Sequence, residues 1–271
     1  MLRTRIIAAI AVAVLVGVNI AVSAIQEDVV FYNDAVVTSN EQYRSVTIYD
    51  SPPETTTIDF YGQGGYLTMY DSSTLNLLEG AMFLSSDYPS WNRLYDSSTL
   101  NVYERAQMGG GSGAGIDMYD SSTLNIYGGT LWLFLQTYDS STVNLYGGII
   151  DSMSIGFGGN SILNVYAGYV SAWVGDIQVE QTATVNIYGY GFEYNPYGKW
   201  MLPIPEGEDG RWVSELTGYS FEGDPIDLWG LPDPATHDNI NLIPEPMTLF
   251  LLGLGSLGLL RIRGRDVTYS G

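Results

Sequence analysis

Residues 119–129 read Tyr-Asp-Ser-Ser-Thr-Leu-Asn-Ile-Tyr-Gly-Gly, and related phrases recur through the middle of this 271-residue chain. Each copy places an asparagine between two apolar residues. The six asparagines are Asn76, Asn101, Asn125, Asn144, Asn164 and Asn186. Their spacing of 19 to 25 residues matches the length of one coil in a solenoid. The repeat therefore predicts a stack of similar coils.

Apolar and polar residues alternate within each copy, which is the pattern of a half-buried β-strand. Glycine commonly follows, as in Gly128-Gly129, and a second apolar stretch comes next, before Asp-Ser-Ser opens the next copy; the chain must turn at the glycines and at Asp-Ser-Ser. Each unit can bury its apolar face only against its neighbours, so we expect an all-β parallel β-helix or related β-solenoid. Hairpins in an up-and-down or propeller arrangement remain an alternative. The residues expected to line the core are Leu124, Ile126, Val143, Leu145, Leu163, Val165, Val185 and Ile187.

Composition divides the chain into further segments. The solenoid is expected over residues 25–195, with degenerate first coils in which Thr47 and Asp59 take the asparagine position. Residues 196–243 hold many prolines and acids and are expected to form a cap and an extended linker. Within them, residues 210–218 are expected to form a final strand over the last coil.

The first 24 residues have the three parts of a secretory signal peptide. Arg3 and Arg5 precede an apolar run, and Val22-Ser23-Ala24 provides a small-x-small cleavage site. We expect signal peptidase to cleave after Ala24, with an uncleaved N-terminal anchor as the alternative. Because the exported chain would contain no cysteine, no disulfide supports its fold.

The charge balance excludes several functions. Residues 25–243 contain 28 acidic and five basic residues, a formal net charge of −23, which would repel nucleic acids.

His237 is the single histidine, so a histidine-based triad or zinc site is not expected. We expect no cofactor, no dedicated metal site and no catalytic residues.

Two kinds of repeated side chain are candidates for binding. Asp71, Asp96, Asp120 and Asp139 recur at one turn and are interpreted as turn formers, with weak calcium binding or catalysis as alternatives. The tyrosines should stack in rows, which either stabilise the solenoid or lie against sugar rings. One row precedes these aspartates, at Tyr70, Tyr95, Tyr119 and Tyr138. The other, the expected glycan-facing row, is Tyr103, Tyr127, Tyr146, Tyr166 and Tyr188.

The C-terminal segment is the most specific signal. Pro244-Glu245-Pro246 precedes a largely apolar stretch of 14 residues, 247–260, and then Arg261, Arg263 and Arg265. Fourteen helical residues span about 21 Å, short of the roughly 30 Å hydrocarbon core. Residues 244–265 closely resemble the PEP-CTERM sorting signal of Gram-negative and related bacteria, although the tail at 266–271 is longer than usual. The repeats also resemble, more weakly, those of solenoid PEP-CTERM proteins from planctomycete-like bacteria.

The resemblance implies a hydrophobic sorting helix, a transient membrane anchor and processing by an exosortase. Extracellular polysaccharide is an implied partner. An ordinary tail anchor is the alternative. The sequence thus favours a non-enzymatic protein of the cell surface or extracellular matrix. A glycan-binding surface module and a carbohydrate-active β-helix enzyme remain alternatives.

Overall fold

The structure is a computed structural model, and it describes residues 27–84, 90–110, 114–152, 154–172, 177–201 and 211–244. Every regular element in these ranges is a β-strand. No helix in them is long and apolar enough to span a membrane. The expected signal peptide with Ala24, and the sorting segment from Glu245 onward, lie outside the described residues.

The repeated phrases form one parallel sheet, which we call the asparagine sheet. Each strand pairs in parallel with the equivalent strand of the next coil. The parallel β-solenoid is thereby confirmed, and the hairpin alternative is wrong for the repeats. The strands of the asparagine sheet are β2 (Ala35–Val37), β4 (Thr57–Phe60), β6 (Thr74–Leu77), β9 (Thr99–Val102), β12 (Thr123–Ile126), β15 (Thr142–Leu145), β18 (Ile162–Val165), the start of β21 (Thr184–Met201) and β24 (Ile240–Pro244).

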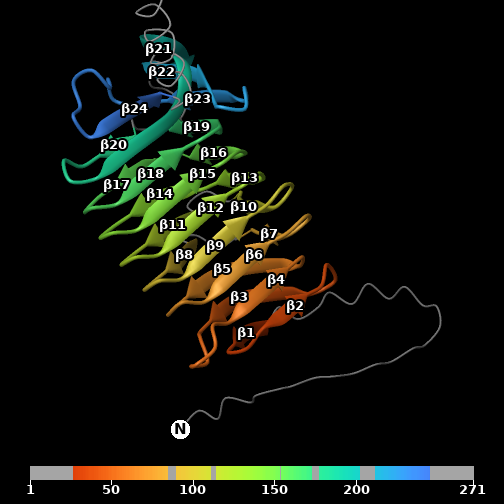
Figure 1. Ribbon diagram of the computed structural model, residues 1–271. Helices are drawn as coiled ribbons and strands as arrows, with labels where there is room; N and C mark the ends of the chain where they lie inside the picture. Colours follow the sequence, from red (N-terminus) through yellow and green to blue (C-terminus); the bar gives the residue numbers. More distant parts are fainter. Residues whose placement is uncertain are drawn as a thin grey trace, which may run out of the picture.

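The other strands form the second sheet, which faces the asparagine sheet across the core. The coils stack in sequence order from β1 at one end to β21–β24 at the other (Figure 1). The strands of the second sheet are β1 (Glu27–Phe31), β3 (Gln42–Ile48), β5 (Gln63–Met69), β7 (Met82–Phe83), β8 (Ser90–Leu94), β10 (Gln107–Gly109), β11 (Ala114–Met118), β13 (Thr130–Trp132), β14 (Phe134–Thr137), β16 (Ile149–Ser152), β17 (Ile155–Phe157), β19 (Gly168–Ala172), β20 (Gln178–Val179), β22 (Arg211–Tyr219) and β23 (Pro225–Trp229).

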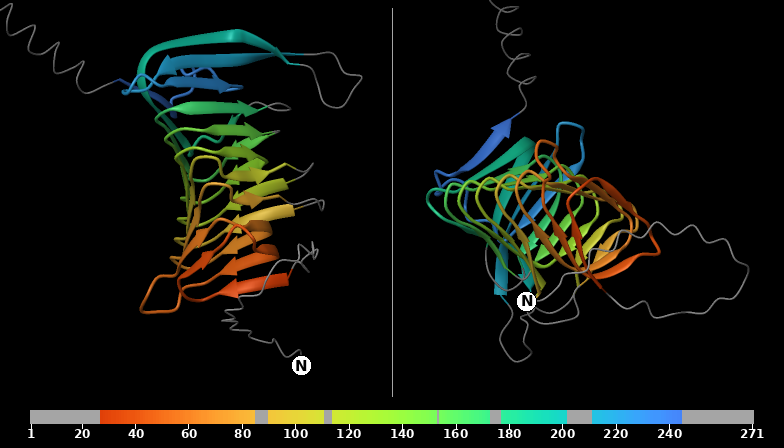
Figure 2. Two further views of the ribbon diagram at one scale, coloured as in Figure 1. Left: turned by 90° about the vertical axis from the view of Figure 1, so that its right-hand side faces the viewer. Right: turned by 90° about the horizontal axis from the view of Figure 1, so that it is seen from below.

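The coils differ in length mainly at one connection. In the middle coils the second-sheet part is split into two strands, such as β13 and β14, and the residues between them vary in number. Only Leu133 lies between β13 and β14, whereas residues 84–89 lie between β7 and β8. Views along and across the stack show the coils following one axis (Figure 2). The uneven spacing of the asparagines therefore leaves the register of the asparagine sheet intact.

Alternation within the strands produces the core. The apolar residues that flank each asparagine are almost fully inaccessible: all eight predicted core residues are at most 1% exposed. They belong to one continuous cluster that runs from Val37 to Ile240. The face assignment made from the sequence is confirmed.

Left-handed backbone conformations make the corners. Gly129 has a φ of 76° and Gly148 a φ of 87°. A Cβ on Gly129 would lie 2.5 Å from the carbonyl oxygen of Ala106, so both conformation and space favour glycine there. At the opposite corner Asp71, Asp96, Asp120 and Asp139 have φ of 57° to 60°. Aspartate tolerates this region better than most residues, which explains its recurrence.

The C-terminal end departs from a simple cap and linker. The expected strand near 210–218 is present as β22, antiparallel to β21 and β23. The chain then returns to the stack: β23 pairs in parallel with β19, and β24 pairs in parallel with β21. The segment after β22 thus contributes one further coil to the solenoid.

One assignment in the first coils is wrong. Thr47 lies in β3 of the second sheet, opposite Thr68, while Asp59 does occupy the asparagine position, opposite Asn76. Strands of both sheets share the order apolar-polar-apolar-tyrosine, as in Val46-Thr47-Ile48-Tyr49 and Leu124-Asn125-Ile126-Tyr127. The local alternation of apolar and polar residues therefore could not distinguish strands of the asparagine sheet from strands of the second sheet.

Candidate functional site

A ladder of side-chain amides runs along the outer face of the asparagine sheet. The Nδ2 of each asparagine donates to the Oδ1 of its equivalent in the preceding coil, over 2.8 to 3.0 Å. All six predicted asparagines take part, and Asn241 of β24 adds a further rung. At the other end Asn76 donates to the carboxylate of Asp59 at 2.7 Å. Every Nδ2 donates toward the N-terminal end of the stack, so the ladder ends there on the negative charge of Asp59.

The tyrosines stack in two rows, as predicted. The aspartate-side row is longer than expected, because Tyr32 and Tyr49 precede Tyr70, Tyr95, Tyr119 and Tyr138. The glycine-side row consists of Tyr103, Tyr127, Tyr146, Tyr166 and Tyr188. Neighbouring rings in the glycine-side row have centroids 4.6 to 5.1 Å apart and planes within 17°. Each such contact is worth roughly 0.5–1.5 kcal/mol.

This stacking decides which part of each ring is accessible. Tyr127 and Tyr146 are 43% and 41% exposed, yet each lies between two stacked neighbours. Their ring faces are therefore covered, and their edges and hydroxyl groups make up the outward surface. Within the glycine-side row, a sugar ring could lie flat only on the outer face of a terminal ring.

Several tyrosines in the rows resist ionisation. Burial, then the charge of Asp117, raises the pKa of Tyr119 to about 12. Burial is also the main cause of the raised pKa of Tyr103, Tyr146 and Tyr166, and neighbouring tyrosines add to it. The raised pKa favours the neutral phenol form of these four tyrosines.

The repeated aspartates form hydrogen bonds between coils. The Oδ2 of Asp96 accepts the backbone N–H of Asp71 at 3.0 Å, and Asp120 and Asp139 accept from the preceding aspartate at 3.1 Å. Gly159 continues the position with a φ of 63°, and there the carboxylate of Glu180 accepts the N–H. The turn-forming interpretation agrees with this geometry. No group of three or more histidine, cysteine, aspartate or glutamate side chains in the described ranges could hold a metal ion.

A carboxylate and an arginine are neighbours on the second sheet. Asp117 of β11 lies opposite Arg93 of β8. Burial raises the pKa of Asp117, while a hydrogen bond from Tyr119 and the charge of Arg93 act in the opposite direction. The arrangement supplies one partly buried carboxylate beside one cation.

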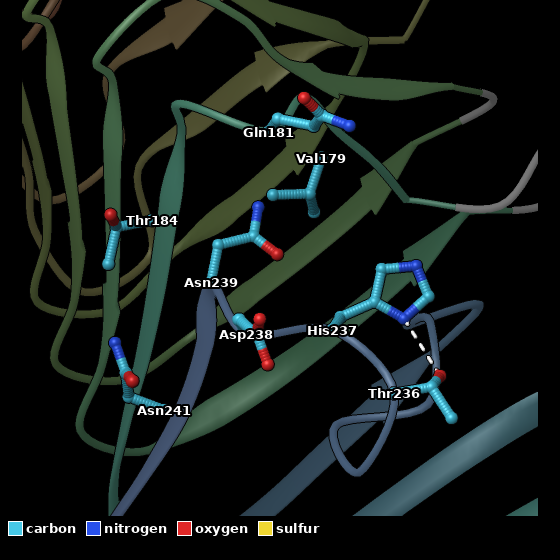
Figure 3. A pocket seen from close by; sticks show the side chains of 8 residues that line it. All are labelled: Val179, Gln181, Thr184, Thr236, His237, Asp238, Asn239 and Asn241. Carbon is cyan, nitrogen blue, oxygen red and sulfur yellow. Dashed lines mark hydrogen bonds between the residues drawn. The ribbon is translucent and has the colours of Figure 1, made fainter.

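A hollow of about 680 Å³ lies near the C-terminal end of the stack (Figure 3). One side is formed by residues around β20 and the start of β21, and the other by the segment that leads into β24. The sequence predicts that His237 lies in an extended linker, and nothing in its local pattern indicates this site. Its lining residues are Val179, Gln181, Thr184, Thr236, His237, Asp238, Asn239 and Asn241.

Of the expected sorting residues only Pro244 is described, as the last residue of β24. Glu245, Pro246, Arg261, Arg263 and Arg265 lie outside the described ranges. The sorting signal would therefore begin directly where the solenoid ends. Comparison with protein-family models found no match, and comparisons with curated proteins and with solved structures found none either.

Proposed function

We propose that the protein is a non-enzymatic structural component of a bacterial cell surface or extracellular matrix. It is exported through its N-terminal signal and sorted by an exosortase through residues 244–265. The observation that carries the proposal is the order Pro-Glu-Pro, apolar span and arginine cluster at the C-terminus. The body would remain outside the cell, because the arginines favour the cytoplasmic side.

The interactions of the repeated side chains support a structural role for the protein. The asparagine amides bond to one another, the aspartate carboxylates bond to backbone N–H groups, and the tyrosine rings stack. Each of these interactions connects one coil to the next. A strongly acidic exterior would keep such a rod soluble and separate from like-charged neighbours.

A glycan-binding surface module is the second candidate. The exposure of Tyr127 and Tyr146 in the glycine-side row favours it, since their phenol groups could bond to sugar hydroxyls. The covered faces of Tyr127 and Tyr146 disfavour the usual flat stacking on a sugar ring. A carbohydrate-active enzyme ranks third, since it would need a further catalytic group facing Asp117 and Arg93.

The sorting signal can be tested in a bacterial host that carries an exosortase. Replacing Pro244, Glu245 and Pro246 with alanine should leave the chain unprocessed and held in the membrane fraction. A matched control replaces Pro232 and Pro234, which lie upstream of the signal, with alanine. If the triple variant reached the surface with the same C-terminus as the wild type, the proposed sorting mechanism would be wrong.

A further inference from the structure

The hollow beside β24 is built by two parts of the chain that are far apart in sequence. Residues 179–184 form one side, and residues 236–241 form the other. Its volume of about 680 Å³ falls within the range of roughly 300–1,000 Å³ typical of small-molecule sites. The side chains that line it come from the last coils of the solenoid: Thr184 begins the sixth repeat, and Asn241 lies opposite Asn186 in β24.

The imidazole ring of His237 is held by contacts at one of its two nitrogens. Its Nδ1 lies 3.1 Å from the backbone carbonyl oxygen of Asp233. The hydroxyl oxygen of Thr236 lies at the same distance of 3.1 Å from Nδ1 (Figure 3). Nδ1 therefore has its partners within the chain, and Nε2 offers a ligand one further nitrogen, which accepts or donates according to the tautomer.

Two asparagines are fixed in a similar way. The Nδ2 of Asn239 donates to the carbonyl oxygens of Glu180 and Ala183 at 2.8 and 2.9 Å. The Nδ2 of Asn241 donates to Asn186 at 3.0 Å. Each amide oxygen therefore remains an acceptor. Asn241 is the last rung of the amide ladder, and polarisation along such a chain strengthens its terminal acceptor.

Acceptors therefore predominate among the lining groups with a defined orientation. The amide oxygens of Asn239 and Asn241 and the carboxylate of Asp238 all require a ligand that brings several donors, and the Nε2 of His237 can pair with a hydroxyl group in either tautomer. A bare metal ion is a poor match, since the hollow is far larger than an ion and Asp238 is the single carboxylate among its lining residues. A neutral sugar carries several hydroxyl donors on a compact ring.

We infer that this hollow binds a neutral sugar unit, whose hydroxyl groups donate to the amide oxygens of Asn239 and Asn241 and form a hydrogen bond with the Nε2 of His237. The site is separate from the tyrosine rows. The inference does not depend on the proposed export or sorting, because it rests on the chemistry of the hollow alone.

The full chain, purified in detergent, can be screened against an array of neutral and acidic oligosaccharides. The tightest binder is then titrated calorimetrically. A neutral oligosaccharide should bind, and His237→Ala and Asn241→Ala should each weaken binding by roughly three- to tenfold, the effect of losing one hydrogen bond. Asn33→Ala serves as the matched control, because Asn33 is exposed near the opposite end of the stack. It should bind as the wild type does.

Circular dichroism establishes that each variant is folded. Should either alanine variant fail to fold, His237→Gln and Thr184→Val test the same site with smaller changes in volume. Absence of binding to every neutral oligosaccharide would overturn the inference. So would binding that the substitutions in the hollow leave unchanged, which would place the sugar elsewhere. Preferential binding of spermidine, used as a cationic probe, would identify a cation site instead and would equally overturn it.

Discussion

Asn241 donates its side-chain amide to Asn186 at 3.0 Å, although 55 residues separate them in the chain. Between the two, the chain leaves the stack through β21, reverses in β22 and returns through β23. The same side-chain hydrogen bond between asparagines therefore forms even where β22 and β23 separate the two paired strands in the sequence. Registry between coils is set by side chains on the outside of the solenoid as well as by its core.

An interior rung of the amide ladder should matter more than the last one. Asn144 both donates to Asn125 and accepts from Asn164, whereas Asn241 makes one ladder bond. Asn144→Ala should lower the free energy of unfolding by about 1–3 kcal/mol, and Asn241→Ala by less. Urea denaturation of both variants checks this order. Equal stability of wild type and Asn144→Ala would show that the ladder contributes nothing.

The aspartate corner should tolerate loss of charge but not loss of the side-chain oxygen. Asp120→Asn keeps an acceptor for the N–H of Asp96 and tolerates the left-handed backbone, so stability should change by less than about 0.5 kcal/mol. Asp120→Ala removes the hydrogen bond and places alanine at a φ of 57°. It should cost about 2–3 kcal/mol. Thermal unfolding of the two variants distinguishes them, and equal losses would contradict the proposed role.

The fold should lose stability in alkali. Burial raises the pKa of Tyr119 to about 12, whereas an unfolded tyrosine titrates near pH 10. Between these values the folded chain retains a proton that the unfolded chain has released, so the free energy of unfolding falls as pH rises. The contribution is fully present below about pH 10. Tyr119→Phe should flatten the decline in denaturation experiments between pH 9 and 12, and an unchanged slope would contradict this assignment.

Calcium should have a small and gradual effect. The row contributes one aspartate per coil, and each of Asp96, Asp120 and Asp139 accepts a backbone N–H. A calcium site needs six to eight oxygen ligands, so millimolar calcium should raise the melting temperature slightly by screening. Asp120→Asn should reduce that rise. A chain that folds in calcium and unfolds in a chelator would overturn the structural interpretation of these aspartates.

Much of the fold could be predicted from one repeated phrase. Asn125 between Leu124 and Ile126 fixed the strand, its buried face and its parallel partner, because a two-residue alternation leaves one register that buries every apolar side chain. The tyrosine rows followed from the same register. These predictions needed only local pattern and regular spacing.

The features that the sequence did not predict lie where the chain leaves the stack of coils and later returns to it. Ile240-Asn241-Leu242 has the same pattern as the six repeats, yet the irregular stretch before it concealed its place in the ladder. The hollow at His237 exists because that segment returns, so local pattern could not reveal it. The prediction for Thr47 is wrong because strands of the asparagine sheet and of the second sheet show the same alternation of apolar and polar residues.

Mass spectrometry of both termini of the protein, recovered from the surface or medium of an exosortase-carrying host, tests the proposed function most directly. We expect an N-terminus at Ile25 and a C-terminus upstream of the arginine cluster at 261–265. Recovery of the chain solely inside the cell, with Met1 and Gly271 both retained, would contradict it.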